Sequence, residues 1–291
     1  MVFADFVALA VESSTDGGLR RYLIVDTAAT RPVDIARSCG LHSGGIDLLT
    51  GESCAWTQSA SPVLIDLSAP STDQGIGSAT RRTLDRWKLA NCFVYLESRF
   101  DPDAMANSLR VRTEATLPEN LPVLLRYFDA RVFKALMGTL TAAQRHAFLT
   151  VGSLWATPGR RGELSKWANS VEEADAPAFI SPLALNAVQE AALLDAGEAD
   201  ALIDVLLNQN NARLVEMTPP DQHETISEAL ASSQKFGING STDQASFCSL
   251  WLELGAGFVA EEPWASALLR VRDKRSTLAD ALTLIASAED A

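Results

Sequence analysis

Three charged residues, Arg126, Asp129 and Arg131, lie close together where an apolar run gives way to a helical pattern. An arginine at the end of a strand, an aspartate at the corner and an arginine one turn further on can meet as a charged cluster. Such a cluster either holds the corner as a structural ion pair or forms an exposed surface that binds a partner. The residue types favour the ion pair, but the sequence leaves both interpretations open.

The neighbouring residues predict a strand that turns into a helix. Val123–Leu125 form a short apolar run bounded by Pro122, which is typical of a buried strand. Asp129 is a good N-cap, because its carboxylate can accept hydrogen bonds from the unpaired N–H groups of a first helical turn. The apolar stripe of the helix that follows consists of Val132, Phe133, Leu136 and Leu140.

Common catalytic and cofactor-binding motifs are missing from the sequence. It has no Gly-Lys-Ser or Gly-Lys-Thr of a phosphate-binding loop, and no Gly-x-Ser-x-Gly. The turn at Gly75–Ala79 lacks the third glycine of a dinucleotide site. Cys39, His42 and Cys54 could begin a metal site, but no convincing fourth ligand lies nearby. We therefore expect no metal and no cofactor, and four cysteines that are reduced thiols.

Titratable residues do not indicate an active site either. The three histidines are far apart, and His146, beside Arg145, is expected to be a surface or packing residue. Acids are plentiful, yet no pair has a context that suggests a general acid beside a general base. We expect no catalytic residue; the alternative is a hydrolase or transferase whose site is assembled from scattered acids and His146. Four tryptophans are expected in hydrophobic cores: Trp155, Trp167, Trp251 and Trp264.

Composition and charge restrict the class of protein. The chain has 291 residues, is 47% hydrophobic, and contains no apolar run of the roughly 18 residues needed to span a bilayer. Its first residues carry acids and no Lys or Arg, which is the wrong pattern for a secretory signal, so we expect a cytoplasmic protein. Residues 1–177 have a net charge of −2 and residues 178–291 a net charge of −11. The acidic half argues against nucleic acid and membranes as partners, and it suits a basic protein surface or a simple solvated face.

The order of elements predicts two lobes. Strands and helices alternate through residues 1–170, which implies a mixed α/β lobe with a mixed sheet flanked by helices. The acidic segment 171–177 ends in proline and is interpreted as a linker, and residues 178–291 are expected to form an all-helical lobe. The main expectations are buried strands at 21–26, 62–67 and 91–97, edge strands at 153–156 and 164–168, a helix that opens at Ser181-Pro182, and a helix at 241–254.

Several blocks of the sequence resemble the adaptor/chaperone proteins of type VI secretion, the Tap/TEC family. The most recognisable block is LPVLLRYFDARVFKALMGTLTAAQRHAFLTVGSLW, residues 121–155. The strands RYLIVDTA, PVLIDL and RWKLANCFVYLES are similar to the family's first strands. KFGINGSTDQASFCSLWLELGAGF, followed by Glu262-Pro263-Trp264, is similar to its helical tail. One departure is Ala130, where the family commonly has proline, and alanine loses the fixed φ of that residue.

The resemblance implies binding and not catalysis. Members of the family load a toxic effector onto the VgrG spike, so the expected partners are the N-terminal region of an effector and the spike protein. The two lobes would form a clamp, and Arg126, Asp129 and Arg131 would either brace it or contact the partner. An interaction module that is unrelated to secretion stays open as an alternative.

Overall fold

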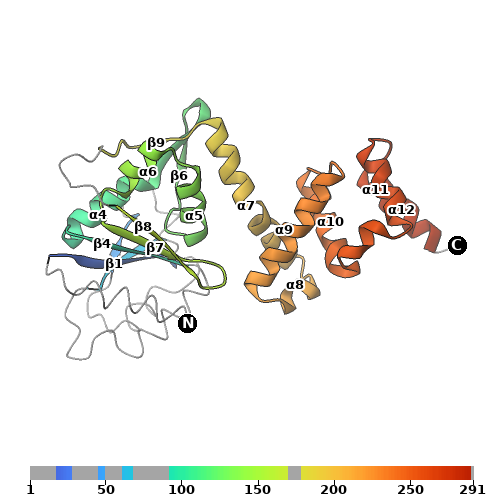
Figure 1. Ribbon diagram of the computed structural model, residues 1–291, viewed down its shortest axis with the longest axis horizontal. Helices are drawn as coiled ribbons and strands as arrows, with labels where there is room; N and C mark the ends of the chain where they lie inside the picture. Colours follow the sequence, from blue (N-terminus) through green and yellow to red (C-terminus); the bar gives the residue numbers. More distant parts are fainter. Residues whose placement is uncertain (1–17, 28–44, 50–60, 68–91, 170–177, 290–291) are drawn as a thin grey trace. The chain divides into compact units, whose positions relative to one another are not determined.

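The computed structural model describes residues 18–27, 45–49, 61–67, 92–169 and 178–289. The chain divides into two compact units, residues 1–194 and 195–291, and each is described by itself. The first unit contains a mixed sheet flanked by helices and the second is all-helical, which confirms the predicted fold class (Figure 1). Within the described residues, no helix combines the length and the apolar character that crossing a membrane requires.

A six-stranded sheet forms the centre of the first unit, in the order β2-β3-β1-β4-β7-β8. The strand predicted at 153–156 is not an edge strand, because β7 pairs with β4 on one side and with β8 on the other. Its residues Trp155 and Ala156 are accordingly fully buried. β8 does lie at the edge, as predicted. The bounds are Arg20–Val25 for β1, Ile46–Asp47 for β2, Val63–Asp66 for β3, Phe93–Ser98 for β4, Leu154–Pro158 for β7 and Leu164–Ala168 for β8.

The two faces of this sheet bury alternate residues of each strand. In β1, Tyr22 and Ile24 belong to the main core, whereas Leu23 and Val25 belong to a smaller cluster on the opposite face. Among the described helices, α4 (Pro102–Arg110), α5 (Ala130–Thr139) and α6 (Ala142–Leu149) contribute buried residues to the main core and cover that face. The largest fully buried side chains of this core are Tyr22, Tyr127, Phe128, Phe133, Phe148 and Trp155.

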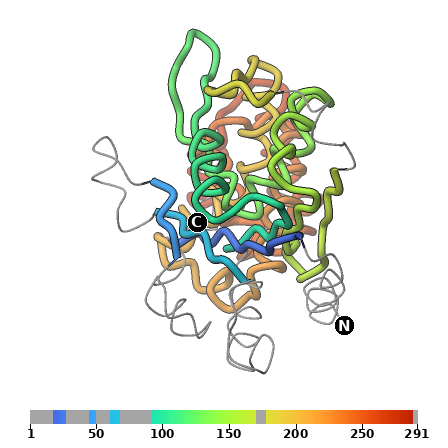
Figure 2. The backbone as a smooth tube through the Cα atoms, turned by 90° about the vertical axis from the view of Figure 1, so that its left-hand side faces the viewer, coloured from blue at the N-terminus to red at the C-terminus, as the bar shows by residue number. Residues whose placement is uncertain are grey.

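A second, smaller sheet has the order β6-β5-β9. The strand predicted to be buried at Val123–Leu125 is β6, and it is largely exposed, with Leu121 at 57% of its surface accessible. The expectation of burial was wrong for Leu124 and right for Leu125, which follows β6 and lies in the main core. β6 is exposed because, among the described strands, it pairs only with β5, and Pro122 has no N–H to offer a further strand. Figure 2 shows the β5–β6 hairpin extending beyond the body of the unit. The bounds are Glu114–Leu117 for β5, Leu121–Leu124 for β6 and Leu183–Ala184 for β9.

The helix expected to open at Ser181-Pro182 begins later. Leu183 and Ala184 first pair in parallel with β5, which keeps this segment extended. The helix α7 then runs from Ala187 to Asn208, across the boundary between the units. Its start is fixed by Asn186 and Gln189, whose side chains each accept a hydrogen bond from the other's backbone N–H. The segment 171–177 that we interpret as a linker lies outside the described residues.

The described helices of the second unit pack around three hydrophobic clusters, which are joined by shared residues such as Trp251 and Trp264. The predicted helix at 241–254 is α10, with exactly those bounds. All four tryptophans predicted to be core residues lie in or against hydrophobic clusters of the two units. The bounds are Ala212–Glu216 for α8, Pro219–Lys235 for α9, Ser241–Leu254 for α10, Trp264–Arg272 for α11 and Leu278–Glu289 for α12.

Candidate interaction site

The predicted strand-to-helix corner is built from a tight turn and an N-cap. The backbone N–H of Asp129 donates to the carbonyl of Arg126 over 3.0 Å, which closes the turn after β6. The Asp129 carboxylate then accepts from the backbone N–H of Arg131 at 2.9 Å, as an N-cap should. The first α-helical bond of α5 follows directly, from Phe133 N–H to the Asp129 carbonyl. The corner therefore forms from local interactions that its own residue types favour.

Two buried aromatic residues anchor the corner to the main core. Tyr127 and Phe128 lie between Arg126 and Arg131 in the sequence, and both are buried in the main core. The Tyr127 hydroxyl donates to the carbonyl of Leu109 at 2.9 Å, and burial raises the pKa of this hydroxyl, so it stays protonated as a donor. The Tyr127 ring also meets Phe148 edge to face at 5.3 Å between centroids. Because these aromatics point into the core, the corner's position relative to the sheet is fixed.

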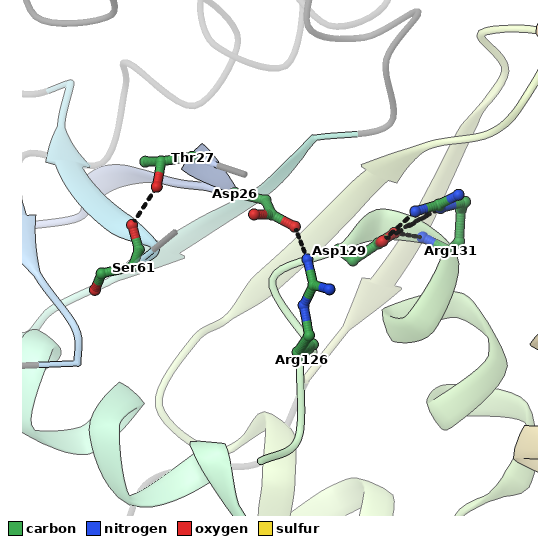
Figure 3. A network of polar contacts seen from close by, with 6 residues as sticks. All are labelled: Asp26, Thr27, Ser61, Arg126, Asp129 and Arg131. Atoms are coloured by element: carbon green, nitrogen blue, oxygen red, sulfur yellow. Dashed lines mark hydrogen bonds and ion pairs between the residues drawn. The ribbon is translucent and has the colours of Figure 1, made fainter. Parts of the chain in front are cut away.

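Arg126 forms its ion pair with a residue that lies 100 positions earlier in the chain. Its Nη2 is 2.7 Å from Oδ2 of Asp26, and this carboxylate is only 5% exposed while the arginine side chain is 48% exposed (Figure 3). Asp26 directly follows β1, and its backbone N–H extends the strand pairing to the Cys92 carbonyl at 2.8 Å. The pair thus ties the corner to the end of β1 and neutralises a carboxylate that is almost completely buried.

Arg131 forms a second ion pair, with Asp129. Its Nη2 is 2.6 Å from Oδ2 and its Nε is 3.0 Å from Oδ1, a bidentate arrangement. The three predicted site residues therefore take part in two ion pairs, Asp26–Arg126 and Asp129–Arg131. The sequence prediction missed Asp26. An acid at the end of the apolar strand RYLIV was the available signal, because a charge at that place needs a partner.

A buried thiol lies close to both carboxylates. Burial raises the pKa of Cys92 from 9.0 to about 12, and the negative charges of Asp26 and, more weakly, Asp129 act in the same direction. A backbone hydrogen bond opposes the shift. The thiol is therefore protonated at neutral pH, and Cys92 acts as a packing residue and not as a nucleophile.

A second group of polar contacts lies at the same end of the sheet, where β1 ends. Thr27, next to Asp26, donates its hydroxyl to the carbonyl of Ser61 at 2.6 Å (Figure 3). The Ser61 hydroxyl donates in turn to the Asp47 carboxylate, which also accepts from the backbone N–H of Leu49 at 2.8 Å. These contacts join the end of β1, the start of β3 and the end of β2. These polar contacts hold the ends of the three strands together. The side chains of Arg126 and Arg131 are each about half exposed.

Part of this unit matches a known protein family. Residues 21–147 match the family model described as "Domain of unknown function (DUF4123)". The searches of curated proteins and of solved structures gave no match. The matched residues begin in β1 and end in α6, so they include the corner and both of its ion pairs. The helical unit lies outside the match.

The other candidates from the sequence do not assemble into a second site. Cys39, His42 and Cys54, as well as the Gly75–Ala79 turn, lie outside the described residues. Among the residues that are described, no group of three His, Cys, Asp or Glu side chains could hold a metal ion. His146 lies half-buried in the last turn of α6, and His223 belongs to α9 in the other unit, where its Nδ1 is 3.4 Å from the Ser227 hydroxyl.

The charge of the helical unit is concentrated in one part of its sequence. Residues 195–262 contain 12 Asp and Glu against Arg213 and Lys235, a net charge of −10. Residues 263–291 are neutral overall, because a basic group at 270–275 offsets their acids. Most of the 12 acids are exposed. The surface formed by α7 to α10 can therefore attract a cationic partner over a distance set by the ionic strength.

Proposed function

We propose that this chain is a cytoplasmic adaptor/chaperone of type VI secretion. It binds a cognate toxic effector and promotes the loading of that effector onto the VgrG spike. Its activity is protein–protein binding without catalysis. The partners are the N-terminal region of the effector and the spike protein, and neither nucleic acid nor a membrane is part of the complex.

The observation that carries this proposal is that the family match and the resemblance fall on the same residues. The match covers residues 21–147, and the most recognisable adaptor block begins at residue 121 and includes the corner. Domains of this family occur in Tap/TEC-type effector adaptors. The departure at Ala130 leaves the corner intact, because Asp129 still caps α5 without the fixed φ of a proline.

The surface chemistry of the chain supports binding as well. An acidic helical unit favours association with a basic protein surface and opposes association with phosphate-rich polymers. The two titratable thiols of the described residues, Cys92 and Cys248, both have a pKa raised to about 12 by burial, so neither offers a ready nucleophile. The half-exposed arginines of the corner give the first unit groups that can bind a partner's carboxylates.

The direct test is co-purification of the tagged full chain with the products of its neighbouring genes. Recovery of a spike protein together with a large toxin is the expected result, identified by mass spectrometry. An unrelated protein of equal length and net charge, carrying the same tag, controls for retention through acidity alone. If the folded chain recovers neither protein, the adaptor proposal fails.

A cellular experiment separates loading from general secretion. Deletion of the gene should abolish export of the cognate toxin, while a toxin that does not depend on this chain should still be exported by the same cells. Equal export of the cognate toxin with and without the gene would contradict the proposal.

A further inference from the structure

A groove runs between α7 and α10 in the helical unit. One cavity of about 460 Å³ is lined mainly by Ala201, Leu202 and Val205 of α7 and by Ala245, Ser246 and Ser249 of α10. A second cavity of about 430 Å³ continues it towards the start of α8 and shares Gln209 and Ser249 with the first. The two cavities therefore adjoin at these residues, and we treat them together as one groove.

The dimensions of the groove fit a helix. Its α7 wall extends from Glu198 to Gln209, which corresponds to about 17 Å at 1.5 Å per residue, or roughly three helical turns. Six of the eleven residues that line the first cavity are Ala, Ser or Thr, so the backbone of an incoming helix can approach closely there. Val205 is 43% exposed and Leu202 is buried beneath it, which gives the groove an apolar floor that water covers in the free protein.

Acidic residues stand at both ends of the groove. Glu198 lines the first cavity, where its carboxylate accepts a hydrogen bond from Gln244 Nε2 at 2.8 Å. Glu253 lines the second cavity, with Arg213 as the basic residue beside it. Around them lies a surface whose sequence, residues 195–262, has a net charge of −10. An occupant with positive charge near its ends is therefore favoured over a neutral or acidic one.

We propose that this groove binds a three-turn amphipathic helix of a partner protein, one with a stripe of small or apolar residues and with Lys or Arg near its ends. This inference rests on the proposed function, since it places one of the adaptor's partners. A second copy of this chain fits less well. Its basic residues 270–275 begin in the last turn of α11, whose apolar residues Ala267 and Leu268 are already buried in its own unit.

Filling the groove tests its role in binding. Ala201 lines the groove and is exposed, so Ala201→Trp should place an indole in the depression and leave the fold intact. The matched control is Ala231→Trp, at an exposed alanine of α9 that does not line the groove. We expect the co-purified partner to bind Ala201→Trp about tenfold or more weakly than the wild type and Ala231→Trp within about twofold. Equal affinities of the two variants would overturn the proposal.

Reversing the charge at one end tests the chemistry of the occupant. Glu253→Lys changes a groove carboxylate, and Glu228→Lys makes the same change at an exposed position of α9. Both variants alter the net charge equally, so a local contact predicts a larger loss of affinity for Glu253→Lys, about fivefold or more. A stronger effect of Glu228→Lys, or no effect of either, would show that the groove does not contact a basic helix.

A photo-crosslinking amino acid at position 201, with position 231 as the control, identifies the occupant in the complex of full-length proteins. Cross-links from position 201 should map to one partner segment with helical apolar spacing and net positive charge. Cross-links to an acidic segment, to a second copy of this chain, or to nothing while the partner still co-purifies would refute the groove inference and leave the proposed function standing. If no spike or toxin co-purifies at all, the proposed function fails and the groove inference fails with it.

Discussion

The two units of this protein bury their apolar residues in different ways. The first has a large main core, in which strands, the described helices α4, α5 and α6 and several aromatic rings meet, including Phe133 stacked on Trp155 at 5.4 Å between centroids, and a smaller cluster on the opposite face of its sheet. The second has three clusters that are each smaller than that main core and are joined by shared residues, Trp251 between the first two and Trp264 and Val271 between the last two. Because hydrophobic stabilisation grows with the apolar area removed from water, a single side chain matters more in the first unit.

Charged residues also differ between the units in how deeply they are buried. In the first unit, charged residues are drawn into the interior, with Asp26, Arg112 and Asp129 all at least 95% buried and paired or hydrogen-bonded. In the second, most acids of α7 to α10 are exposed. Substitution of a charged residue should therefore change stability in the first unit and binding in the second. The predictions below test this contrast, from the largest expected effect to the smallest.

Arg112 should give the largest effect on stability. Its side chain is 3% exposed, its Nε donates to the Phe148 carbonyl at 2.8 Å, and its Nη1 donates to the Ser108 carbonyl at 2.6 Å. The guanidinium also lies 4.4 Å from the centre of the Phe179 ring. Arg112→Met would leave buried carbonyls without donors, so we expect the free energy of unfolding to fall by about 3 kcal/mol or more. Chemical denaturation followed by tryptophan fluorescence measures the change.

The control for this substitution is Arg213→Met, which removes an exposed arginine of the helical unit. It should change the free energy of unfolding by less than about 0.5 kcal/mol. If Arg112→Met were equally mild, the carbonyls at the end of α6 would have to find other donors, and the contrast between the units would lose its main support.

The two buried thiols allow the units to be compared at alkaline pH. Burial is the main cause that raises the pKa of Cys92 and of Cys248 from 9.0 to about 12. Their contribution to stability is complete below the unfolded pKa and is lost as the pH rises towards the folded pKa. Each thiol should therefore lower the stability of its unit by about 1.4 kcal/mol per pH unit above about pH 9. Cys92→Ala should remove this pH dependence from the first unit only, and Cys248→Ala from the second unit only. In each case the number of protons released on unfolding falls by about one.

Local signals explain the parts of the fold that could be predicted. Asp129 accepts from the first turn of α5, and Thr141 forms a reciprocal capping box with Gln144 at the start of α6. Such contacts involve residues three positions apart or fewer, so the sequence displays them directly. Strand β9 was missed because Leu183 pairs with Ala115, a contact that only the folded chain creates. The exposure of β6 was missed for the same reason, since burial depends on the number of neighbouring strands.

The two ion pairs of the candidate site also differ in whether their partners are close in the sequence. The pair of Asp129 with Arg131 could be predicted, because the two residues are two positions apart. The partner of Arg126 could not, because Asp26 is brought to the corner by the sheet. An apolar run that ends in an acid indicates only that the acid needs a partner, and the chain contains many arginines that could serve.

The two ion pairs of the corner should differ in their effect on stability. Arg126→Ala removes the arginine that pairs with the almost completely buried carboxylate of Asp26, whereas Arg131→Ala leaves Asp129 with its N-cap bond to α5. Since both arginines are about half exposed, we expect losses of about 1–2 kcal/mol for Arg126→Ala and less than about 1 kcal/mol for Arg131→Ala. Thermal unfolding of both variants measures the difference.

Binding data on the same variants decide between the two roles of the corner. A loss of partner affinity in Arg131→Ala without a loss of stability would identify the exposed arginine as a contact residue. Normal stability and normal affinity in both variants would mean that the corner neither braces the unit nor binds a partner.

The smallest effect should be the response of association to salt. If the exposed acids of α7 to α10 steer a basic partner, the association rate constant should fall severalfold between about 50 mM and about 500 mM NaCl, because screening shortens the reach of surface charges. The dissociation rate constant should change less, because the contacts that we propose within the groove would be short-range and partly apolar. Stopped-flow measurements with the purified partner give both constants. A salt-independent association rate would mean that the acidity of the helical unit serves solubility, and that its difference from the first unit has no role in recognition.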